Sequence, residues 1–401
     1  MAPIWYNNNM EATIEKIIYT GKSLAHIDGK VILTDEGLPG EIVTIEPVRE
    51  KKNYTEARTT GIIKKAAERT APRCSHYKSC SPYQYIDYAY QLKIKEAQLR
   101  ETLTHELKSD FCSILVKPSP HIWGYRNKVR LKILWKDGKP RLAYHIPQTT
   151  NEFAEIDECF LASPEMNSLL NETLKVLTEK KQLSVDEIEI KESFSEKKFL
   201  TILHSSSKKE PLISGDTFIE EKVAGKLFQF GPRSFFQINV EMTEELIKDI
   251  KDFLALTGKE TIADLYCGVG TFGIALSENA GKVIGVESEK ENITFLKKNI
   301  SLNSIGNFEI KEGYCEKLIG SILKQKPDVI ILDPPRKGLD EITRENIMKH
   351  GARFIVYVSC SPSTLARDLK TLLKKYRIRR TTFYDFFPHT THIEACVILE
   401  K

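Results

Sequence analysis

Short apolar runs that alternate with polar positions fill residues 11–66 of the chain. Turn sequences break these runs at Asp28-Gly29 and at Gly37-Leu-Pro-Gly40. Closely spaced short strands separated by such turns predict a small all-β unit in the form of a barrel. This barrel suits an OB-like nucleic-acid binder and equally a structural module, so the pattern leaves both interpretations open. The expected strands are Thr13–Tyr19, Lys30–Thr34, Glu41–Val48 and Arg58–Lys65.

The apolar spacing becomes helical between Ile94 and Leu107, where apolar side chains recur at intervals typical of one helix face. Beyond this helix, basic strand-like runs such as Tyr125–Leu131 and Phe199–His204 are mixed with a helix predicted over Pro164–Glu179. This mixture predicts a middle domain of the α+β class.

From about Gly215 onward, apolar strand-like runs alternate with helical segments, as a parallel sheet requires. Pro327–Asp333 and Phe354–Cys360 read as buried strands, and helices are predicted from near Thr243 and over 290–303. Strand ends of this kind belong at the carboxyl edge of an open sheet, where ligands bind. We therefore expect three domains, over residues 1–72, 73–214 and 215–401.

A glycine-rich turn follows the apolar run that begins at Thr261. Gly268, Gly270 and Gly273 fit the pattern G-x-G-x-x-G, which allows a tight turn and a close approach of the backbone to a ligand. The pattern alone is weak, but a second apolar run ends in Glu287, 17 residues after Gly270. A doubly wound sheet places there the carboxylate that holds a ribose, so the two features together predict a nucleoside cofactor.

The chain has 401 residues, of which 41% are hydrophobic and 28% charged, as expected for a globular protein of two or three domains. Met1–Met10 lacks the pattern of a secretion signal and no apolar run is long enough to cross a membrane, so we expect a cytoplasmic protein. Eight cysteines in such a protein favour reduced thiols, metal ligation or catalysis over disulfides.

The formal net charge of +4 says little about partners, but its distribution is uneven. Residues 49–73 hold eight Lys or Arg against three Glu. This basic segment is compatible with a surface that contacts phosphates and with an ordinary solvated loop.

Two successive strand ends carry residues that dehydrogenase chemistry does not require. Asp333-Pro-Pro ends one strand and Cys360 ends the next. Methyl transfer explains both, because the acidic strand end would shape the rim of a cofactor site and the cysteine opposite it suggests covalent catalysis. In such an enzyme Glu287 would hold the ribose of S-adenosylmethionine, and the glycine loop would lie under its methionine part.

Ordered motifs along nearly the whole chain resemble the RNA (uracil-5-)methyltransferases, which make 5-methyluridine in tRNA or ribosomal RNA. Residues 11–66 look like the TRAM barrel of this family, and Gly124-Tyr-Arg-Asn-Lys looks like its central-domain signature. The other motifs are Phe235-Phe-Gln-Ile-Asn239, Asp264-Leu-Tyr-Cys-Gly-Val-Gly270, Asp333-Pro-Pro-Arg-Lys-Gly338, Ser359-Cys-Ser-Pro362 and Phe387-Pro-His-Thr-Thr-His-Ile-Glu394. The resemblance implies a Rossmann-like class I methyltransferase domain preceded by a small OB-like barrel and a central α+β domain.

The resemblance also implies the roles of individual residues. Cys360 would be the nucleophile and Glu394 the base, on a loop before a final strand over Cys396–Leu399. The contacts to S-adenosylmethionine would be Gln237, Tyr266, Glu287 and Asp333. The chemistry requires these residue types, because C5 of uracil is a poor nucleophile until a thiolate adds to C6, and a carboxylate must then remove the C5 proton.

The position after Asp333-Pro-Pro helps to select the base that is methylated. Related enzymes that act on cytosine typically carry a cysteine there, and those that methylate amino groups carry an aromatic residue, whereas this chain has Arg336. Uracil is therefore expected. A stacked base is out of reach, so the target should be flipped out of the RNA while the two N-terminal domains grip the surrounding strand. We expect a monomer with no membrane contact.

The cysteines depart from the family pattern. Many members carry C-x5-C-x2-C and a distant fourth cysteine for a 4Fe-4S cluster, whereas this chain has Cys74, Cys80 and Cys159 but Tyr83 in place of the remaining ligand. His76 is the nearest substitute. A cluster with a different fourth ligand and a cluster-free member both remain open. For the chain as a whole, a nicotinamide-dependent oxidoreductase and a catalytically idle RNA-binding module are the alternatives.

Overall fold

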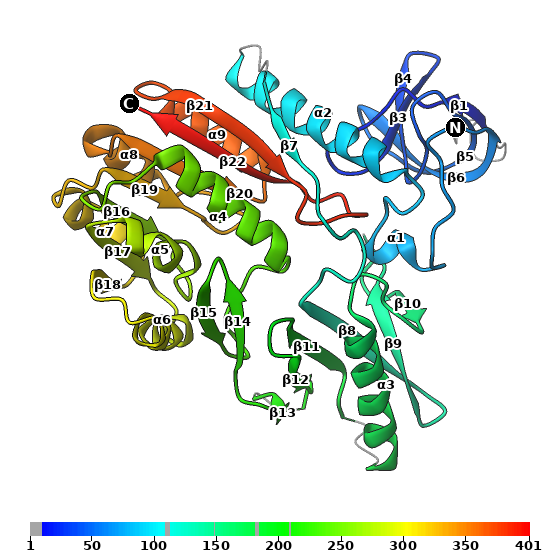
Figure 1. Cartoon of the computed structure of the whole chain (residues 1–401). Coiled ribbons are helices and arrows are strands. Elements are labelled where there is room, and N and C mark those ends of the chain that lie inside the picture. Colours follow the sequence, from blue (N-terminus) through cyan, green and yellow to red (C-terminus); the bar gives the residue numbers. More distant parts are fainter. Residues whose placement is uncertain (1–9, 109–112, 148, 181–183, 208–209) are drawn as a thin grey trace. The chain divides into compact units, whose positions relative to one another are not determined.

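The computed structural model describes residues 10–108, 113–147, 149–180, 184–207 and 210–401 (Figure 1). The segment on which the expectation of a missing secretion signal rests therefore lies almost entirely outside the described residues. The chain forms two compact units. The first takes Met1–Thr102 together with Phe387–His392, and the second takes Leu103–Phe386 together with Ile393–Lys401. The division into three domains stays a prediction.

A six-stranded sheet makes up the beginning of the first unit, in the order β1-β5-β6-β4-β3-β2. Neighbouring strands within this sheet pair in the antiparallel sense, except that β4 and β6 are parallel. Alternate residues such as Ala12, Ala25, Val43 and Ile45 point inward and form its core. The strands are β1 (Met10–Thr13), β2 (Lys16–Ile17), β3 (Ser23–Ile27), β4 (Lys30–Thr34), β5 (Ile42–Glu50) and β6 (Tyr54–Lys64).

A second, aromatic core in the same unit links this sheet to two helices, α1 (Tyr77–Cys80) and α2 (Tyr88–Leu107). Tyr83 and Tyr85 are fully buried in it together with Leu38 of the Gly37–Gly40 turn. Arg69 is bound by Glu36 and Glu41 at 2.6 and 2.7 Å. One of the eight basic residues of the 49–73 segment is thus committed to an internal ion pair.

The second unit contains another six-stranded sheet, in the order β10-β9-β8-β11-β12-β13, and every pair in it is antiparallel. Helix α3 (Pro164–Glu179) packs against this sheet. Ser163 caps the first turn of this helix, and Pro164 fixes its first residue. The strands are β8 (Lys128–Lys136), β9 (Lys139–His145), β10 (Phe153–Ile156), β11 (Glu187–Ser193), β12 (Lys198–His204) and β13 (Leu212–Gly215).

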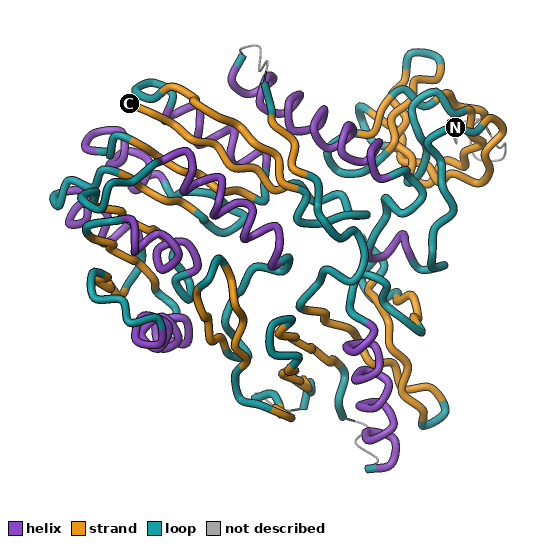
Figure 2. The backbone as a smooth tube through the Cα atoms, viewed as in Figure 1, coloured by secondary structure: helices purple, strands orange, loops and turns teal. Residues whose placement is uncertain are grey.

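An eight-stranded sheet forms the rest of the second unit, in the order β18-β17-β16-β19-β20-β22-β21-β7 (Figure 1). Figure 2 shows its strands in orange and the neighbouring helices in purple. A hairpin, β14 (Ile219–Val223) and β15 (Lys226–Phe230), and helix α4 (Val240–Leu254) lead into it. The strands are β16 (Thr261–Leu265), β17 (Lys282–Glu287), β18 (Phe308–Glu312), β19 (Val329–Leu332), β20 (Phe354–Ser359), β21 (Arg377–Tyr384), β22 (Glu394–Glu400) and β7 (Leu115–Lys117). The connecting helices are α5 (Thr271–Leu276), α6 (Lys290–Leu302), α7 (Cys315–Leu323), α8 (Glu341–His350) and α9 (Pro362–Leu372).

The strand order changes direction between β16 and β19. From β16 the chain proceeds to β17 and β18 on one side, then returns to β19 and continues to β20 on the other. Right-handed crossovers consequently place α5 and α6 on one face of the sheet and α7, α8 and α9 on the opposite face. Open α/β sheets bind their ligands at this switch point, beyond the carboxyl ends of the strands.

Strand β22 is antiparallel to both of its neighbours, β20 and β21. Its first residue, Glu394, therefore lies at the edge where β20 ends. The expectation that Glu394 stands on a loop before the strand was wrong by this small margin. Strand β7 pairs with β21 at the outer edge, so a segment expected in the central domain joins this sheet.

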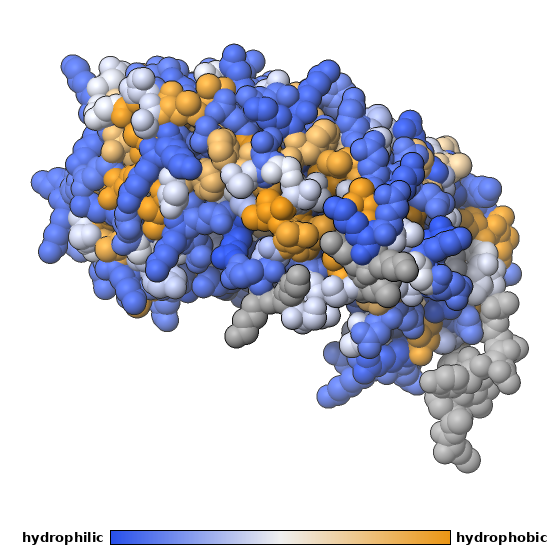
Figure 3. Space-filling model, turned by 90° about the horizontal axis from the view of Figure 1, so that it is seen from below, coloured by the Kyte–Doolittle hydropathy of each residue, from blue (hydrophilic) through white to orange (hydrophobic). Residues whose placement is uncertain are grey.

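Charged and polar side chains cover most of the face seen in Figure 3, and apolar side chains appear between them in small groups. Scattered apolar residues are normal on a globular protein. Among the described residues, no helix is long and apolar enough to span a membrane.

Candidate active site

The glycine loop after β16 is held by a buried carboxylate. Asp264 is fully buried, and its Oδ2 accepts a hydrogen bond from the backbone N–H of Gly273 at 2.8 Å. The pKa of Asp264 is raised to about 7, mainly by burial and also by the charges of Asp333 and Glu287, while the Gly273 bond opposes the shift. Asp264 was not predicted as a site residue, although its position at the end of an apolar run was the available signal.

Backbone conformation explains the residue types in this loop. Gly268 and Gly270 have φ angles of +58° and +96°, in the left-handed region that glycine adopts without strain. Tyr266 has a φ of +64°, which is costly for a bulky residue and is typical of functional loops. Its hydroxyl lies 3.4 Å from Oδ2 of Asp340, and its side chain is partly buried.

Glu287 ends β17 directly beside the glycine loop. Its Oε1 accepts from the backbone N–H groups of Ser288 and Glu289 at 2.6 and 2.7 Å, and its Oε2 accepts from Gly268 at 2.9 Å. The side chain is 8% exposed. Oε2 also accepts a longer bond from Nδ2 of Asn292 at 3.4 Å. Because the same carboxylate bridges the loop and the strand end, it has a fixed orientation.

Gln237 and Asp333 meet across the switch point. The Gln237 amide donates from Nε2 to Oδ2 of Asp333 at 2.9 Å. Burial raises the pKa of Asp333 to about 7, and the hydrogen bond from Gln237 opposes that shift. The pair joins the segment before α4 to the end of β19, so two residues distant in sequence lie side by side at the switch point.

The segment that carries Gln237 is held by the six-stranded sheet of the second unit. Asn127 Nδ2 donates to the Gln237 carbonyl at 2.8 Å, and the buried Lys191 donates to the carbonyls of Gly231 and Ser234 at 2.9 and 2.8 Å. Asn239 caps α4 through Met242. Asn127 belongs to the Gly124-Tyr-Arg-Asn-Lys motif, so this motif supports the backbone at Gln237.

Cys360 and Glu394 face the same edge of the sheet. The antiparallel register pairs Ser359 with Ala395, so the next position along sets Cys360 opposite Glu394. Cys360 directly follows β20, as Asp333 directly follows β19. The sheet thus gathers three residues that lie far apart in the sequence.

The ionisation of these groups is coupled. The pKa of Cys360 is raised to about 11, mainly by burial and also by the charges of Glu394 and Asp333, while Arg336 acts to lower it. Burial raises the pKa of Glu394 well above its ordinary value, with Asp333 acting in the same direction and Arg336 against it. Arg336 therefore favours both ionised groups, a role that its sequence position did not suggest.

Exposure distinguishes Cys360 from the cysteine of the glycine loop. Cys267 is buried beneath that loop, where desolvation raises its pKa well above the usual range. Cys360 is partly exposed at the strand end. Only an accessible thiol can attack a substrate, so of these two cysteines Cys360 has the surroundings of a nucleophile.

The three cysteines proposed as metal ligands have different surroundings. In the first unit, Cys74 Sγ lies 3.3 Å from Nε2 of Gln84, and Cys80 Sγ lies 3.2 Å from Oγ of Ser81. In the second unit, Cys159 is buried in the core, with its Sγ 3.2 Å from the Tyr144 hydroxyl.

Tyr83, at the position of the missing ligand, is a core residue whose hydroxyl accepts from Gln98. Across the described ranges, no group of three or more His, Cys, Asp or Glu side chains is placed to hold a metal ion. No step of the reaction is therefore assigned to a cluster. The metal assignment stays a prediction.

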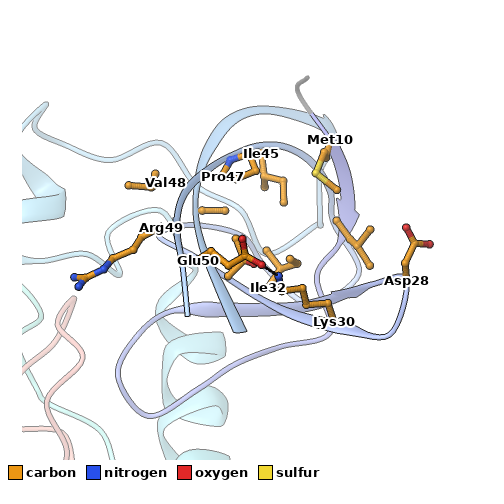
Figure 4. Close-up of a pocket in the computed structure, with 12 residues that line it drawn as sticks. Met10, Asp28, Lys30, Ile32, Ile45, Pro47, Val48, Arg49 and Glu50 are labelled. Carbon is orange, nitrogen blue, oxygen red and sulfur yellow. Dashed lines mark hydrogen bonds and ion pairs between the residues drawn. The ribbon is translucent and has the colours of Figure 1, made fainter. Parts of the chain in front are cut away.

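A cavity of about 140 Å³ lies elsewhere, within the sheet of the first unit (Figure 4). Apolar side chains such as Ile32 and Ile45 line it, and the strands curve around them. The charged residues Lys30 and Glu50 are bound to each other in an ion pair. The cavity contains none of the residues predicted to act in catalysis.

The doubly wound sheet, its glycine loop and the acidic ends of β17 and β19 define a class I methyltransferase. Residues 185–401 match the tRNA (Uracil-5-)-methyltransferase family. An uncharacterized RNA methyltransferase of Clostridium tetani is 30% identical, over 98% of this chain and 97% of its own length. Another from Halalkalibacterium halodurans is 29% identical, over 100% and 98%.

Among solved structures, the Pyrococcus abyssi tRNA (uracil-54, C5)-methyltransferase in complex with S-adenosyl-L-homocysteine superposes with a TM-score of 0.79. The match covers 97% of this chain and 99% of that one at 24% identity, and it shows a shared fold. The chain belongs to the tRNA (Uracil-5-)-methyltransferase family, and it is an S-adenosylmethionine-dependent RNA methyltransferase. The predicted family and fold class are confirmed, and the oxidoreductase alternative is excluded.

Proposed function

We propose that this enzyme methylates C5 of a uridine in tRNA or ribosomal RNA through a covalent bond between Cys360 and C6 of the base. The observation that carries this proposal is the register of β20 and β22, which sets Cys360 opposite Glu394 at the edge that also holds Asp333. In this proposal the nucleophile, the base and the residues that contact the cofactor lie together at the switch point of the sheet.

S-adenosylmethionine is held by Gln237, Tyr266, Glu287 and Asp333 in this proposal. Glu287 binds the ribose hydroxyls, because its carboxylate is fixed at the end of β17 beside the glycine loop. Gln237 and Asp333 form the wall between cofactor and substrate. The bound cofactor supplies an electrophilic methyl group.

The protein groups act in a fixed order. The Cys360 thiolate forms a bond to C6, and the displaced electron pair makes C5 a nucleophile that takes the methyl group, leaving S-adenosylhomocysteine. Glu394 removes the C5 proton, the C5–C6 double bond re-forms, and the S–C6 bond breaks to release the thiolate. Burial suits Glu394 to this role, because a carboxylate with a raised pKa is a stronger base.

The target uridine is flipped out of its stack to reach Cys360, since neither C5 nor C6 is accessible within a stacked helix. The N-terminal barrel and the central sheet grip the surrounding RNA. The substrate is identified by mapping 5-methyluridine by mass spectrometry in RNA from cells with and without the protein.

The order of steps separates nucleophile from base in one experiment. RNA from cells lacking the protein is incubated with enzyme and methyl-labelled S-adenosylmethionine, then run on a denaturing gel. We expect Glu394→Gln to accumulate a labelled RNA–protein adduct, because the methyl group is transferred but the C5 proton cannot leave. Cys360→Ala and the double variant should give no adduct and no product.

Two outcomes would overturn these assignments. A labelled adduct from Cys360→Ala would mean that another thiol attacks C6. Normal turnover by Glu394→Gln would mean that another group, with Asp333 the first alternative, removes the proton.

A further inference from the structure

The loop before Glu394 belongs to a different unit from the strands on either side of it. Phe387–His392 is part of the first unit, whereas Phe386 and Ile393, and with them β21 and β22, are part of the second. The chain therefore leaves the second unit for six residues and returns just before the proposed base. Helix α2 supplies the side chains that hold this loop.

Gln91 of α2 binds His389 at two points. Its Oε1 accepts from the His389 backbone N–H at 2.9 Å, and its Nε2 lies 3.0 Å from Nδ1 of the same residue. Its Nε2 also donates to the carbonyls of Tyr83 and Ile86 at 3.2 and 2.9 Å. Gln91 is fully buried, so its amide is oriented by obligatory backbone partners.

His389 needs this support because its backbone is strained. Its φ of +64° lies in the left-handed region, which is unfavourable for a non-glycine residue and persists only where the surrounding structure enforces it. Burial lowers the pKa of His389 to about 3, and Lys95 and Arg73 contribute to that shift. The ring is thus neutral, and Nδ1 is the acceptor for the Gln91 amide, because the Oε1 of Gln91 already faces a backbone donor.

Lys95, one turn further along α2, holds the start of the loop. Its ammonium donates to the Phe387 carbonyl at 2.9 Å, and the side chain is fully buried. Thr390 donates its hydroxyl to the same carbonyl at 2.9 Å. Lysine side chains are rarely fully buried in proteins, so the position of Lys95 at a loop carbonyl indicates that it holds this carbonyl in place.

The two ends of the loop are close to the site in sequence. Phe386 precedes it and accepts from Nδ2 of Asn239, two residues after Gln237. Ile393, fully buried, is the single residue between the loop and Glu394. Any change in loop conformation that leaves Glu394 in place would have to be compensated by Ile393 alone, and one residue spans only about 3.5 Å.

We propose that Gln91 and Lys95 are positioning residues for the proton-removal step, acting by fixing the Phe387–His392 loop and so the start of β22 and the Glu394 carboxylate. This inference rests on the proposed role of Glu394 as the base. The N-terminal unit then does more than grip RNA, since it also sets the geometry of the last chemical step.

The test follows the RNA–protein adduct with time. Gln91→Ala and Lys95→Met should form the labelled adduct at a rate close to that of the unmodified enzyme, because Cys360 stands at the end of β20. They should release it roughly tenfold or more slowly, because small displacements of a catalytic group are costly. Lys95→Met keeps most of the side-chain volume, and it serves if Gln91→Ala does not fold.

Gln98→Ala is the matched control. Gln98 lies on the same helix and is almost as buried, but its amide binds the carbonyls of Ile17 and Ile18 and the Tyr83 hydroxyl. It should lower the melting temperature without delaying release of the adduct. Adduct accumulation in Gln98→Ala as well would overturn the inference, because general loosening of α2 would then explain the effect.

Glu394→Gln is run in parallel to separate two kinds of failure. If it forms no adduct, the base assignment itself is wrong. If it does, and both Gln91→Ala and Lys95→Met release the adduct at the normal rate, the base stands and the positioning role is refuted.

Discussion

At the scale of single residues, burial raises the pKa of several acidic groups and of one thiol in the site. Asp264 and Asp333 both have a pKa raised to about 7, and Cys360 has one raised to about 11. Arg336 is the cation that opposes this trend at both Cys360 and Glu394. The sequence offered Arg336 only as an argument against cytosine, since its electrostatic role depends on strand ends that meet in space.

The pH dependence of thiol alkylation tests the role of Arg336. The thiolate fraction of Cys360 rises tenfold per pH unit below its pKa, and removing the positive charge of Arg336 raises that pKa further. Arg336→Gln should therefore react more slowly with iodoacetamide at pH 8, by roughly threefold to tenfold. Above the pKa it should react equally fast or faster, because the thiolate of a weaker acid is more nucleophilic.

Peptide mass spectrometry after timed alkylation isolates the rate at Cys360 from those of the other cysteines. Lys337→Gln removes a neighbouring exposed charge and serves as the control, while Arg336→Lys should restore much of the effect. If Arg336→Gln and Lys337→Gln gave the same profile, Arg336 would have no special influence on the thiol.

At the scale of elements, the sequence predicts those helices and strands whose bounds depend on residues close together in the chain. The bounds of α3 agree with the prediction, because Ser163 and Pro164 are strong start signals. The buried strands β19 and β20 were found as continuous apolar runs, each followed by its functional residue. Helix α2 begins at Tyr88, before the predicted Ile94, because Asp87 accepts from the Tyr90 N–H at its start.

What the sequence could not show depends on long-range pairing. Strand β3 (Ser23–Ile27) was not among the expected strands, and it is defined by its pairing with β4 and β2. The place of Glu394 on β22 follows from its register with β20, and the attachment of Phe387–His392 follows from contacts with α2 far away in the sequence. No local pattern encodes either.

The glycine loop is an element whose two positive-φ glycines should differ in their tolerance of side chains. A Cβ on Gly268 would meet nothing within 4 Å, whereas one on Gly270 would lie 2.6 Å from Leu296 and 2.7 Å from Ile274. Gly268→Ala bears only the cost of the left-handed backbone, about 1–2 kcal/mol, and Gly268→Asn should cost less. Gly270→Ala adds overpacking of about 1–3 kcal/mol.

Urea unfolding of the three variants checks the order, with Gly268→Asn the most stable and Gly270→Ala the least. Equal midpoints for Gly268→Ala and Gly270→Ala would show that the side chains around Gly270 yield without cost. S-adenosylmethionine is left out of the measurement, so that binding does not shift the apparent stability.

At the scale of the whole molecule, the chain combines a doubly wound sheet with an N-terminal unit that carries the basic 49–73 segment. The sheet holds the proposed cofactor site, and the loop after β21 ties the proposed base to the N-terminal unit. Because Arg69 is bound by Glu36 and Glu41, the charges of that segment are not all available to RNA. Lys64 and Lys65, at the end of β6, are exposed.

Reversing both charges, Lys64→Glu with Lys65→Glu, tests whether this segment binds phosphates. We expect a higher KM for RNA and a shallower dependence of log KM on log salt, with the slope reduced by about 1 for each phosphate that the variant no longer binds. Affinity for S-adenosylmethionine, measured by calorimetry, should be unchanged.

The control reverses Lys374 and Lys375, an exposed pair in the second unit that gives the same change in net charge. If the control flattened the slope equally, the effect would come from net charge alone. If neither pair changed it, the basic segment would be a solvated surface, and the grip on RNA would lie elsewhere on the molecule.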